Sequence, residues 1–486
     1  VRTDLNTSVI NMASFGSEVN EVVLRIGDIK ISPATTEGAS NVFSPTPFIL
    51  TRTRWVPDSD ASFCILCNEK FTQVRRRHHC RVCGKVLCAK CCFEKIILPQ
   101  YGEEEPTRVC NACFPISNTI AQARSIQMTP RLEAAKNLAE ASGSQKVLKK
   151  LVESGGVQAI IHLAQTNISE VKEAVADGLN NLALHPPFHS MIVQCGGIKA
   201  LCSILSSSSD GQSQAVIKAL STLKLLSKSD KLKILVVAEG ALTPLMALCM
   251  SSDSTVTILS LTTLGIVLES PVNVASFTEN FKNGLQTILR LTKSNDEKIQ
   301  EVALRVLALL ACGTPDQRRR LVEEDNYAGK CIQNTLKRRP KNLEVYTNGA
   351  CLIANLAVCA DIQSSLMDCI DLVCKLIDSH AENLSIQKHA SRAVANFSKH
   401  KENARFLVSH LSQIIRVHVN CDKREVKANG IRAIFYLLEY QPENTIAALT
   451  KEGISGLLRG LLQFNGTVSK VRGALVDHVP ELSKPM

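Results

Sequence analysis

Four Cys-x-x-Cys pairs lie close together in one short segment of the sequence. The pairs are Cys64/Cys67, Cys80/Cys83, Cys88/Cys91 and Cys110/Cys113. Two cysteines separated by two residues can direct both sulfurs at one ion, and four thiolates complete the tetrahedral shell of Zn²⁺. The eight cysteines therefore predict two closed structural zinc sites without an open position for a catalytic water. So short a segment cannot bury enough apolar surface to fold alone, so we expect metal binding and folding to be coupled.

A disulfide knot is the alternative interpretation of these cysteines. The remaining cysteines argue against it, because residues such as Cys195, Cys312 and Cys351 are scattered among apolar residues, as small buried thiols are in a reducing compartment. Cys92 directly follows Cys91 and is surplus to the eight, so we leave it out of the predicted ligand set.

Three motifs around the cysteines resemble those of the FYVE zinc finger. Trp55-Val56-Pro57-Asp58 is similar to its WxxD motif, Arg76-Arg77-His78-His79-Cys80-Arg81 to its (R/K)(R/K)HHCR motif, and Arg108-Val109-Cys110 to its RVC motif. The resemblance covers about residues 52–115. It implies a cross-brace, in which the first and third cysteine pairs hold one Zn²⁺ and the second and fourth pairs hold the other.

The resemblance also implies binding of phosphatidylinositol 3-phosphate. A phosphate monoester carries close to two negative charges and three acceptor oxygens, which arginine side chains can engage with paired N–H donors. A carboxylate would accept hydrogen bonds from inositol hydroxyls and repel a phosphate placed on them. The alternative is an ordinary solvated basic surface. The predicted headgroup residues are Asp58, Arg76, Arg77, His78, His79, Arg81 and Arg108.

The loop before the basic run departs from the family pattern, which has an exposed apolar pair that inserts into the bilayer. Here the loop reads Phe71-Thr72-Gln73-Val74, so a polar residue replaces one of the pair. Val74 is the predicted membrane-inserting residue, with Leu66 as a second candidate. We expect weakened penetration, so that firm recruitment needs a second copy or a partner on the same membrane.

The rest of the chain predicts a helical repeat. A motif of a small residue followed by apolar residues returns at intervals of 40 to 45 residues, which is typical of an armadillo or HEAT solenoid. Asn-Leu pairs such as Asn181-Leu182 and Asn355-Leu356 resemble those of armadillo repeats, although Lys224, Gly265, Ala308 and Tyr436 interrupt the series. The motif positions are Gly156, Gly197, Ala241, Gly284, Gly329, Cys369, His410 and Gly453.

These patterns predict a mostly α chain with three regions. Residues 1–50, rich in Ser, Thr and Asn, are expected to be disordered. Residues 52–115 are expected to form a small two-zinc finger of short strands and a helix, and residues 129–480 an armadillo-like α-solenoid. The basic runs 318–320 and 337–341 are expected to be solvated. Val1 is an unusual first residue, so Met12 is a possible true start, or the sequence is a fragment.

The function expected from this organisation is that of a cytoplasmic, non-catalytic adaptor, peripheral on early endosomes or related membranes, whose solenoid binds an unidentified protein. No P-loop, zinc-protease helix or nucleophile elbow is present in the sequence. The net charge of +11 suits an anionic membrane. It would also suit nucleic acid, but no recognition motif supports that partner. The longest apolar stretch is interrupted by charges, so no transmembrane helix is expected.

A RING-like ubiquitin ligase is the alternative function, because that finger also cross-braces two zinc ions. RING fingers usually include a histidine among the ligands, whereas here all eight ligands can be cysteine.

Overall fold

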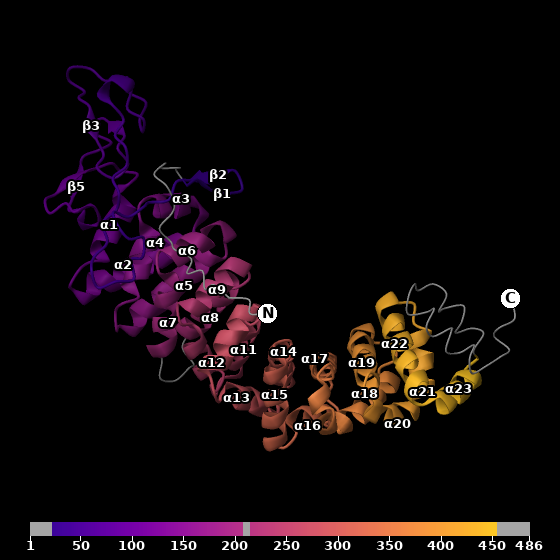
Figure 1. The fold of residues 1–486 in the computed structure, drawn as a ribbon. Helices are drawn as coiled ribbons and strands as arrows, with labels where there is room; N and C mark the ends of the chain where they lie inside the picture. The colour runs from indigo at the N-terminus through magenta and orange to yellow at the C-terminus, as the bar shows by residue number, and fades with distance from the viewer. Residues whose placement is uncertain (1–21, 208–213, 454–486) are drawn as a thin grey trace, which may run out of the picture. The chain divides into compact units, whose positions relative to one another are not determined.

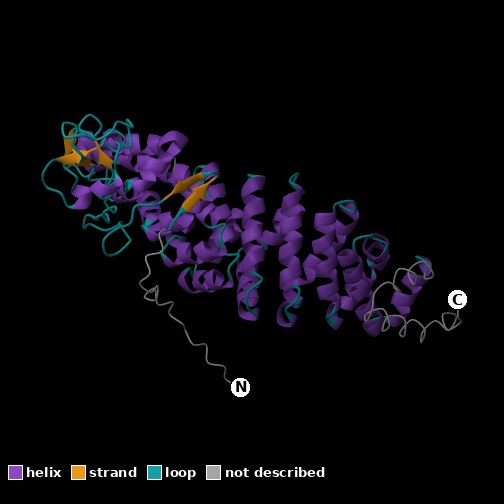
Figure 2. Ribbon diagram, turned by 90° about the horizontal axis from the view of Figure 1, so that it is seen from above, coloured by secondary structure: helices purple, strands orange, loops and turns teal. Residues whose placement is uncertain are grey.

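The computed structural model describes residues 22–207 and 214–453 (Figures 1 and 2). The chain forms two compact units, Val1–Ala200 and Leu201–Met486, which we describe separately. The first half of the segment expected to be disordered, residues 1–21, and the predicted end of the solenoid, residues 454–480, lie outside the described residues.

Residues 22–50 are ordered, so the prediction of disorder is wrong for this part of the chain. Strands β1 (Leu24–Ile26) and β2 (Ile29–Ile31) form an antiparallel hairpin. Beyond it, the chain makes a loop that we call the strap, residues 36–50, which is closed at its base by the bridge between Thr36 and Leu50. The strap packs on the helices that follow in the first unit, and these tertiary contacts supply the order that its polar composition did not predict.

The strap is held mainly through backbone groups. The amide of Val42 donates to the Cys195 carbonyl at 2.9 Å, and Nε2 of Gln165 donates to the carbonyls of Val42 (3.3 Å) and Ser44 (2.6 Å). Leu50 is fully buried and lies so close to Gly155 that a Cβ there would come within 2.4 Å of its side chain. The strap therefore needs a glycine beneath it at this position.

The zinc-finger region consists of short elements joined by turns. Strands β3 (His78–His79) and β4 (Val86–Leu87) pair antiparallel, as do β5 (Glu94–Ile96) and β6 (Thr107–Val109). Two single helical turns, η1 (Asp58–Asp60) and η2 (Pro99–Tyr101), and the helix α1 (Phe114–Gln122) complete it. Because the finger contains so little regular structure, the two cysteine clusters are its main organising feature.

Seven further helical elements follow α1 in or at the edge of the first unit. Helix α2 packs along α5, and α1 contacts both α2 and α4. The elements are α2 (Met128–Gly143), α3 (Gln145–Glu153), α4 (Gly156–Leu163), α5 (Ser169–Ala183), η3 (Pro186–Phe188), α6 (His189–Gln194) and α7 (Gly197–Ser207).

The second unit is a stack of helical repeats, most with two short helices and one long helix. Three helices in about 42 residues are typical of armadillo repeats, which confirms the predicted armadillo-like fold. The helices are α8 (Gln214–Leu226), α9 (Asp230–Ala238), α10 (Leu242–Leu248), α11 (Ser254–Val267), α12 (Pro271–Asn280), α13 (Gly284–Leu291), α14 (Glu297–Leu310), α15 (Pro315–Tyr327), α16 (Cys331–Lys337), α17 (Leu343–Leu356), α18 (Met367–Ser379), α19 (Leu384–Ser398), α20 (Lys401–Val408), α21 (Leu411–Ile414), α22 (Arg424–Tyr440) and α23 (Pro442–Lys451).

Two repeats depart from this pattern. The turns η4 (Ala360–Ile362) and η5 (Ser364–Leu366) stand where the repeat before α18 would have its first short helix. A π-helical segment, η6 (Ile415–Val419), directly continues α21. Its residue His418 is completely buried.

The repeat motif marks the start of the second short helix in most repeats. The glycine at or just before the motif has a left-handed backbone at Gly155, Gly196, Gly240 and Gly329, with φ between 86° and 94°. Glycine adopts this conformation at little cost, so it can end one short helix and turn the chain into the next.

The long helices α8, α11, α14, α17, α19 and α22 pack side by side, each against the next (Figure 1). We call the surface that they form the long-helix face. Asparagines tie neighbours together: Nδ2 of Asn355 donates to the Ala308 carbonyl at 2.8 Å, and Nδ2 of Asn396 donates to the Ala354 carbonyl at 2.9 Å. The Asn-Leu positions therefore have a structural role in this unit.

The basic run 318–320 contributes to packing and is not simply solvated. Arg318 donates to the Ala311 carbonyl and Arg320 to the Lys282 carbonyl, while Arg319 forms an ion pair with Asp361 at 2.6 Å. The run therefore connects helix α15 to the elements around it.

Candidate metal centre and headgroup site

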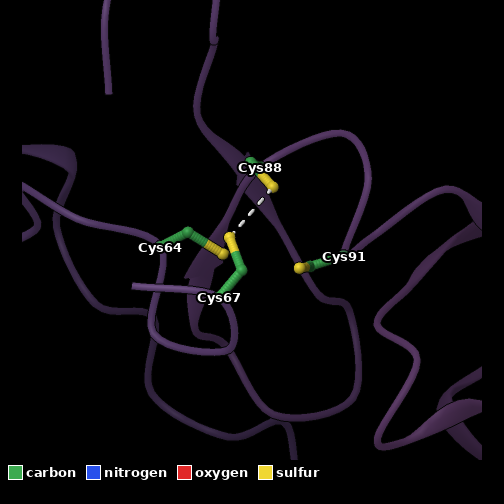
Figure 3. A group of neighbouring side chains, drawn as sticks. All are labelled: Cys64, Cys67, Cys88 and Cys91. Atoms are coloured by element: carbon green, nitrogen blue, oxygen red, sulfur yellow. Dashed lines mark hydrogen bonds between the residues drawn. The ribbon is translucent and has the colours of Figure 1, made fainter. Parts of the chain in front are cut away.

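The first and third Cys-x-x-Cys pairs converge on one point. The thiols of Cys64, Cys67, Cys88 and Cys91 lie within 4.8 Å of one another, and their side chains turn toward a common centre (Figure 3). Burial acts to raise the pKa of Cys64, but hydrogen bonds from the backbone of Cys88, Cys67 and Leu66 outweigh it and lower the pKa to about 6. Zinc binds the thiolate form; burial raises the pKa of Cys91 in the same group, so of these two thiols Cys64 is the more easily deprotonated.

The second and fourth pairs form the other group. The thiols of Cys80, Cys83, Cys110 and Cys113 also lie within 4.8 Å of one another, and the group is more buried than the first. The interleaved pairing is the predicted cross-brace. Two sets of four cysteines fit two structural zinc ions, and the prediction of Zn²⁺ as the cofactor is confirmed.

Cys92 belongs to neither group, although it directly follows a ligand. Its side chain is completely buried, and burial raises the pKa of its thiol to about 12. A neutral buried thiol of this kind packs as a small apolar group.

Two left-handed residues shape the turns around the ligands. Asn68 follows the first pair with φ 56°, and Gly84 follows the second pair with φ 65°. Each turn returns an amide to the first cysteine of its pair: the amides of Asn68 and Gly84 donate to the carbonyls of Cys64 and Cys80 at 2.7 and 2.9 Å. A Cβ on Gly84 would lie 2.5 Å from the Arg54 carbonyl oxygen.

Trp55 of the WxxD segment organises one part of the basic surface. The rings of Trp55 and His79 stack with centroids 4.5 Å apart, and the Arg81 guanidinium lies 4.6 Å from the Trp55 ring. Nε2 of His79 donates to the Val56 carbonyl at 2.8 Å and lies 3.8 Å from an Asp58 oxygen. The structure therefore brings three of the predicted headgroup residues together around Trp55.

A second part of the predicted site lies around an open cavity of about 590 Å³. Arg76 and His78 line it, next to Val74 and Lys90. Because successive residues of a strand point to opposite faces, His78 and His79 on β3 serve different parts of the surface. Burial lowers the pKa of His78, with Arg108 and Arg76 acting in the same direction.

Lys90, which also lines this cavity, was not among the predicted headgroup residues. It lies between Cys88 and Cys91, and the β3–β4 pairing together with the first zinc group brings it beside the basic run. A cation inside a Cys-x-x-Cys pair is the signal that could have identified it.

The two remaining predicted arginines bond to the finger itself. Nε of Arg77 donates to the Ala61 carbonyl at 3.0 Å, and its guanidinium lies 5.1 Å from the Phe71 ring. Arg108 donates to the Cys92 carbonyl at 2.9 Å. These contacts fix both guanidinium groups and leave part of the N–H donors of each for a ligand.

The predicted inserting residue projects from the loop. The Val74 side chain is 94% exposed, whereas Phe71 in the same loop is buried. Leu66, the second candidate, is also exposed, and so are its neighbours Phe63 and Ile65. The finger therefore presents several apolar side chains to solvent.

Comparison with known proteins identifies this part of the chain. Residues 54–119 match the family model of the FYVE zinc finger, so they form a FYVE zinc finger. A Lateral signaling target protein 2 homolog from Brugia malayi is 47% identical over 79 residues, which are 15% of this chain and 13% of that protein. Zinc finger FYVE domain-containing protein 16 from Mus musculus is 53% identical over 76 residues, 16% of this chain and 5% of that protein.

A third relative, zinc finger FYVE domain-containing protein 26 from Bos taurus, is 34% identical over 139 residues, 24% of this chain and 6% of that protein. The chain thus spans only a small part of the length of these curated relatives. The match is to a FYVE finger, and nothing in these comparisons favours the RING-like alternative.

The solenoid resembles a solved structure of an engineered protein. The structural match covers 76% of this chain and 99% of the engineered chain, with a TM-score of 0.53 and 21% sequence identity. This likeness concerns the fold alone. Among the described residues, no single helix is long and apolar enough to cross a bilayer, and one pair, Pro186–Gln194 and Gly197–Ser207, meets that test only jointly across an 80° bend.

Proposed function

We propose that this protein is a non-catalytic adaptor. Its FYVE finger recruits it to membranes containing phosphatidylinositol 3-phosphate, and its solenoid binds a protein partner there. The observation that carries the proposal is the FYVE match over residues 54–119 with the Arg-Arg-His-His-Cys-Arg run complete. The membranes are those of early endosomes or related compartments, as the family resemblance implies.

The arrangement of charge supports recognition of a single phosphate monoester. Arg76 and Lys90 are exposed, and Arg76 has no hydrogen-bond partner among the described residues. Arg81 is oriented by stacking on Trp55 and can offer its remaining N–H donors to the same anion. Asp58 is exposed beside His79 and would accept bonds from inositol hydroxyls while repelling a second phosphate.

Membrane contact is proposed to occur through the exposed loop. Val74 borders the cavity lined by Arg76 and His78, so apolar insertion and headgroup binding would occur on the same side of the finger. One exposed valine buries little apolar surface, so we expect single-copy binding to be weak and strengthened by a second copy or by the solenoid's partner.

Vesicle flotation tests this function. We expect the full chain to float with vesicles containing phosphatidylinositol 3-phosphate, and less with vesicles containing phosphatidylinositol, its 4-phosphate or its 3,5-bisphosphate. Arg76→Ala and Arg81→Ala should each lower the bound fraction at least about fivefold, because each removes a charge-assisted contact of roughly 1.5–3 kcal/mol.

Arg25→Ala is the matched control, because Arg25 is an exposed arginine of β1 outside the finger. It removes the same charge and should float like the wild type. Equal flotation on all four vesicles, or variants that bind as well as Arg25→Ala, would contradict the proposed headgroup site.

A further inference from the structure

The long-helix face carries a row of arginines that packing of the repeats only partly uses. Arg392 on α19 and Arg432 on α22 occupy equivalent positions of successive repeats. NH2 of Arg392 donates to Oδ1 of Asn355 at 2.9 Å, and NH2 of Arg432 donates to Oδ1 of Asn396 at 3.2 Å. Each arginine therefore lies across the asparagine of the preceding long helix.

Through these contacts, the side-chain oxygens of Asn355 and Asn396 each accept a hydrogen bond from an arginine. The amide nitrogens of the two asparagines also form hydrogen bonds, because each donates to a backbone carbonyl of the preceding long helix. In this part of the face, the asparagine side chains are engaged in holding neighbouring helices together. The groups that remain available belong to the arginines.

Both guanidinium groups keep unused donors. Their Nε atoms are buried without an acceptor, and among the described residues no acceptor bonds to either NH1. Both side chains are half-buried, so the stems are fixed and an incoming ligand can reach only the distal nitrogens. An anchored guanidinium loses little rotamer freedom when it binds a carboxylate.

Around the two arginines lie a neutral histidine, an ion pair and an aromatic border. Burial lowers the pKa of His389 to about 4, and the nearby Arg392 and Lys388 act in the same direction. Glu425 is the acidic neighbour and pairs with Lys388 at 3.2 Å. On α22, the rings of Tyr436 and Tyr440 stack one turn beyond Arg432.

We propose that the part of the long-helix face formed by α17, α19 and α22 binds an extended acidic peptide, with Arg392 and Arg432 each taking one carboxylate. This inference rests on the proposed protein-binding function of the solenoid and names the chemistry of the partner. Packed helices are about 10 Å apart, and an extended chain in the polyproline II conformation rises about 3.1 Å per residue with three residues per turn, so side chains three residues apart lie on the same side. The two carboxylates therefore lie about three residues apart in the ligand, in the pattern Glu-x-x-Glu.

Fluorescence anisotropy of the full chain with a labelled peptide made of Glu-Ser-Thr triplets tests this. Peptides in which Lys or Gln replaces each Glu are the controls. We expect the Glu peptide to bind at least tenfold tighter than either control, and added salt to weaken its binding because the contacts are between charges.

The variants Arg392→Gln and Arg432→Gln remove the charge but can still donate to the asparagine oxygen, so the fold is kept. The double variant should lose at least tenfold in affinity for the Glu peptide. Arg290→Ala, on an exposed arginine of the short helix α13, should change nothing. Equal binding of the three peptides, or an unchanged double variant, would overturn the inference.

Flotation of the same proteins on vesicles containing phosphatidylinositol 3-phosphate separates this inference from the proposed function. If the protein floats but does not discriminate the peptides, the acidic-peptide inference fails alone. If the double variant loses the Glu peptide and floats normally, the peptide site is independent of the finger, as proposed.

Discussion

Gly84 shows how tightly single residues are constrained around the zinc ligands. Its φ of 65° belongs to the left-handed region, and the Arg54 carbonyl lies directly over the place of a Cβ. Gly102 has a similar φ of 71°, but only the end of the Ile49 side chain comes within 4.0 Å. Substitutions at the two glycines can therefore be compared to separate the effect of backbone strain from that of a steric clash.

We expect Gly84→Ala to weaken zinc retention and Gly102→Ala to have a smaller effect. Each substitution costs about 1–2 kcal/mol from the left-handed conformation. Gly84→Ala must in addition displace a backbone oxygen next to the second zinc group. Zinc released to a chromogenic chelator measures the difference, and equal release from the two variants would show that the close contact has no effect.

The residues of the site were predictable to the extent that they belong to sequence-local motifs. The two groups of cysteines could be expected because spacing along the chain determines zinc ligation. Lys90 could not, because its place beside Arg76 depends on strand pairing and on the metal group. The division of His78 and His79 between two parts of the surface likewise follows from β3.

At the scale of single helices, N-terminal caps set where most of the later long helices begin. Asp253, Asp296, Asn342 and Asn383 cap α11, α14, α17 and α19, each accepting a backbone N–H of the first turn. Outside the long-helix face, α15 begins with a capping box, in which Thr314 and Gln317 bond reciprocally at 3.3 and 2.8 Å.

Thr314→Ala should lower the free energy of unfolding by about 1 kcal/mol, since it leaves an amide of the first turn unpaired. Ser270→Ala is the matched control: Ser270 stands at the same place before α12, also followed by proline, but its side chain makes no cap hydrogen bond. Chemical denaturation measures both. A loss that is equally large in Ser270→Ala would exclude the cap as the cause.

The π-helical segment η6 contains a histidine that must stay neutral. Nε2 of His418 donates to Oε1 of Gln387 at 2.9 Å, and Nδ1 is buried without a partner. Nε2 of Gln387 donates to the His380 carbonyl, so Gln387 presents its oxygen to the histidine. Burial lowers the pKa of His418 to about 3.

Because the folded-state pKa lies below the ordinary value near ~6.5, the unfolded chain binds this proton first and stability falls as pH drops below about 6.5. Between pH 7 and pH 5 this histidine should cost about 2 kcal/mol. Asp325 acts in the opposite direction, because burial raises its pKa to about 6. The wild type is therefore compared with His418→Gln in denaturant titrations at pH 7 and pH 5. The free energy of unfolding of the variant should fall by about 2 kcal/mol less than that of the wild type, and an identical fall would contradict the role given to His418.

The elements themselves were predictable where a period was present. The returning glycine motif located the starts of most second short helices because a left-handed turn there needs glycine. The strap was not predictable, because its order comes from Gln165, Cys195 and Gly155, all far away in the sequence. The replacement of one short helix by η4 and η5 left no signal in the spacing either.

At the scale of the molecule, the finger and the first helices form parts of one compact unit. The Leu50 amide donates to the Gln100 carbonyl at 2.8 Å, and Arg124, just after α1, donates to the Pro99 carbonyl at 2.7 Å and to the Phe48 carbonyl. Nε2 of Gln100 in turn bonds to the Ser117 carbonyl. These buried polar contacts link the strap, the finger and α1.

Chelation should therefore disturb more than the finger. Structural zinc contributes roughly 10–16 kcal/mol per site in small peptides, so its removal should unfold the finger and release the strap. We expect hydrogen exchange in α3 and α4 to accelerate after zinc removal, while exchange in α17 and α19 stays unchanged. Uniform acceleration through both units, or none outside residues 54–119, would contradict this coupling.

The contact between Leu50 and Gly155 has a mechanical consequence. If the finger is embedded in a bilayer, it cannot reorient independently of the first helices of the solenoid, because the strap packs against both. Docking onto a vesicle should thus impose a preferred tilt on helices α3 and α4, which spin labels placed there would register as reduced tumbling.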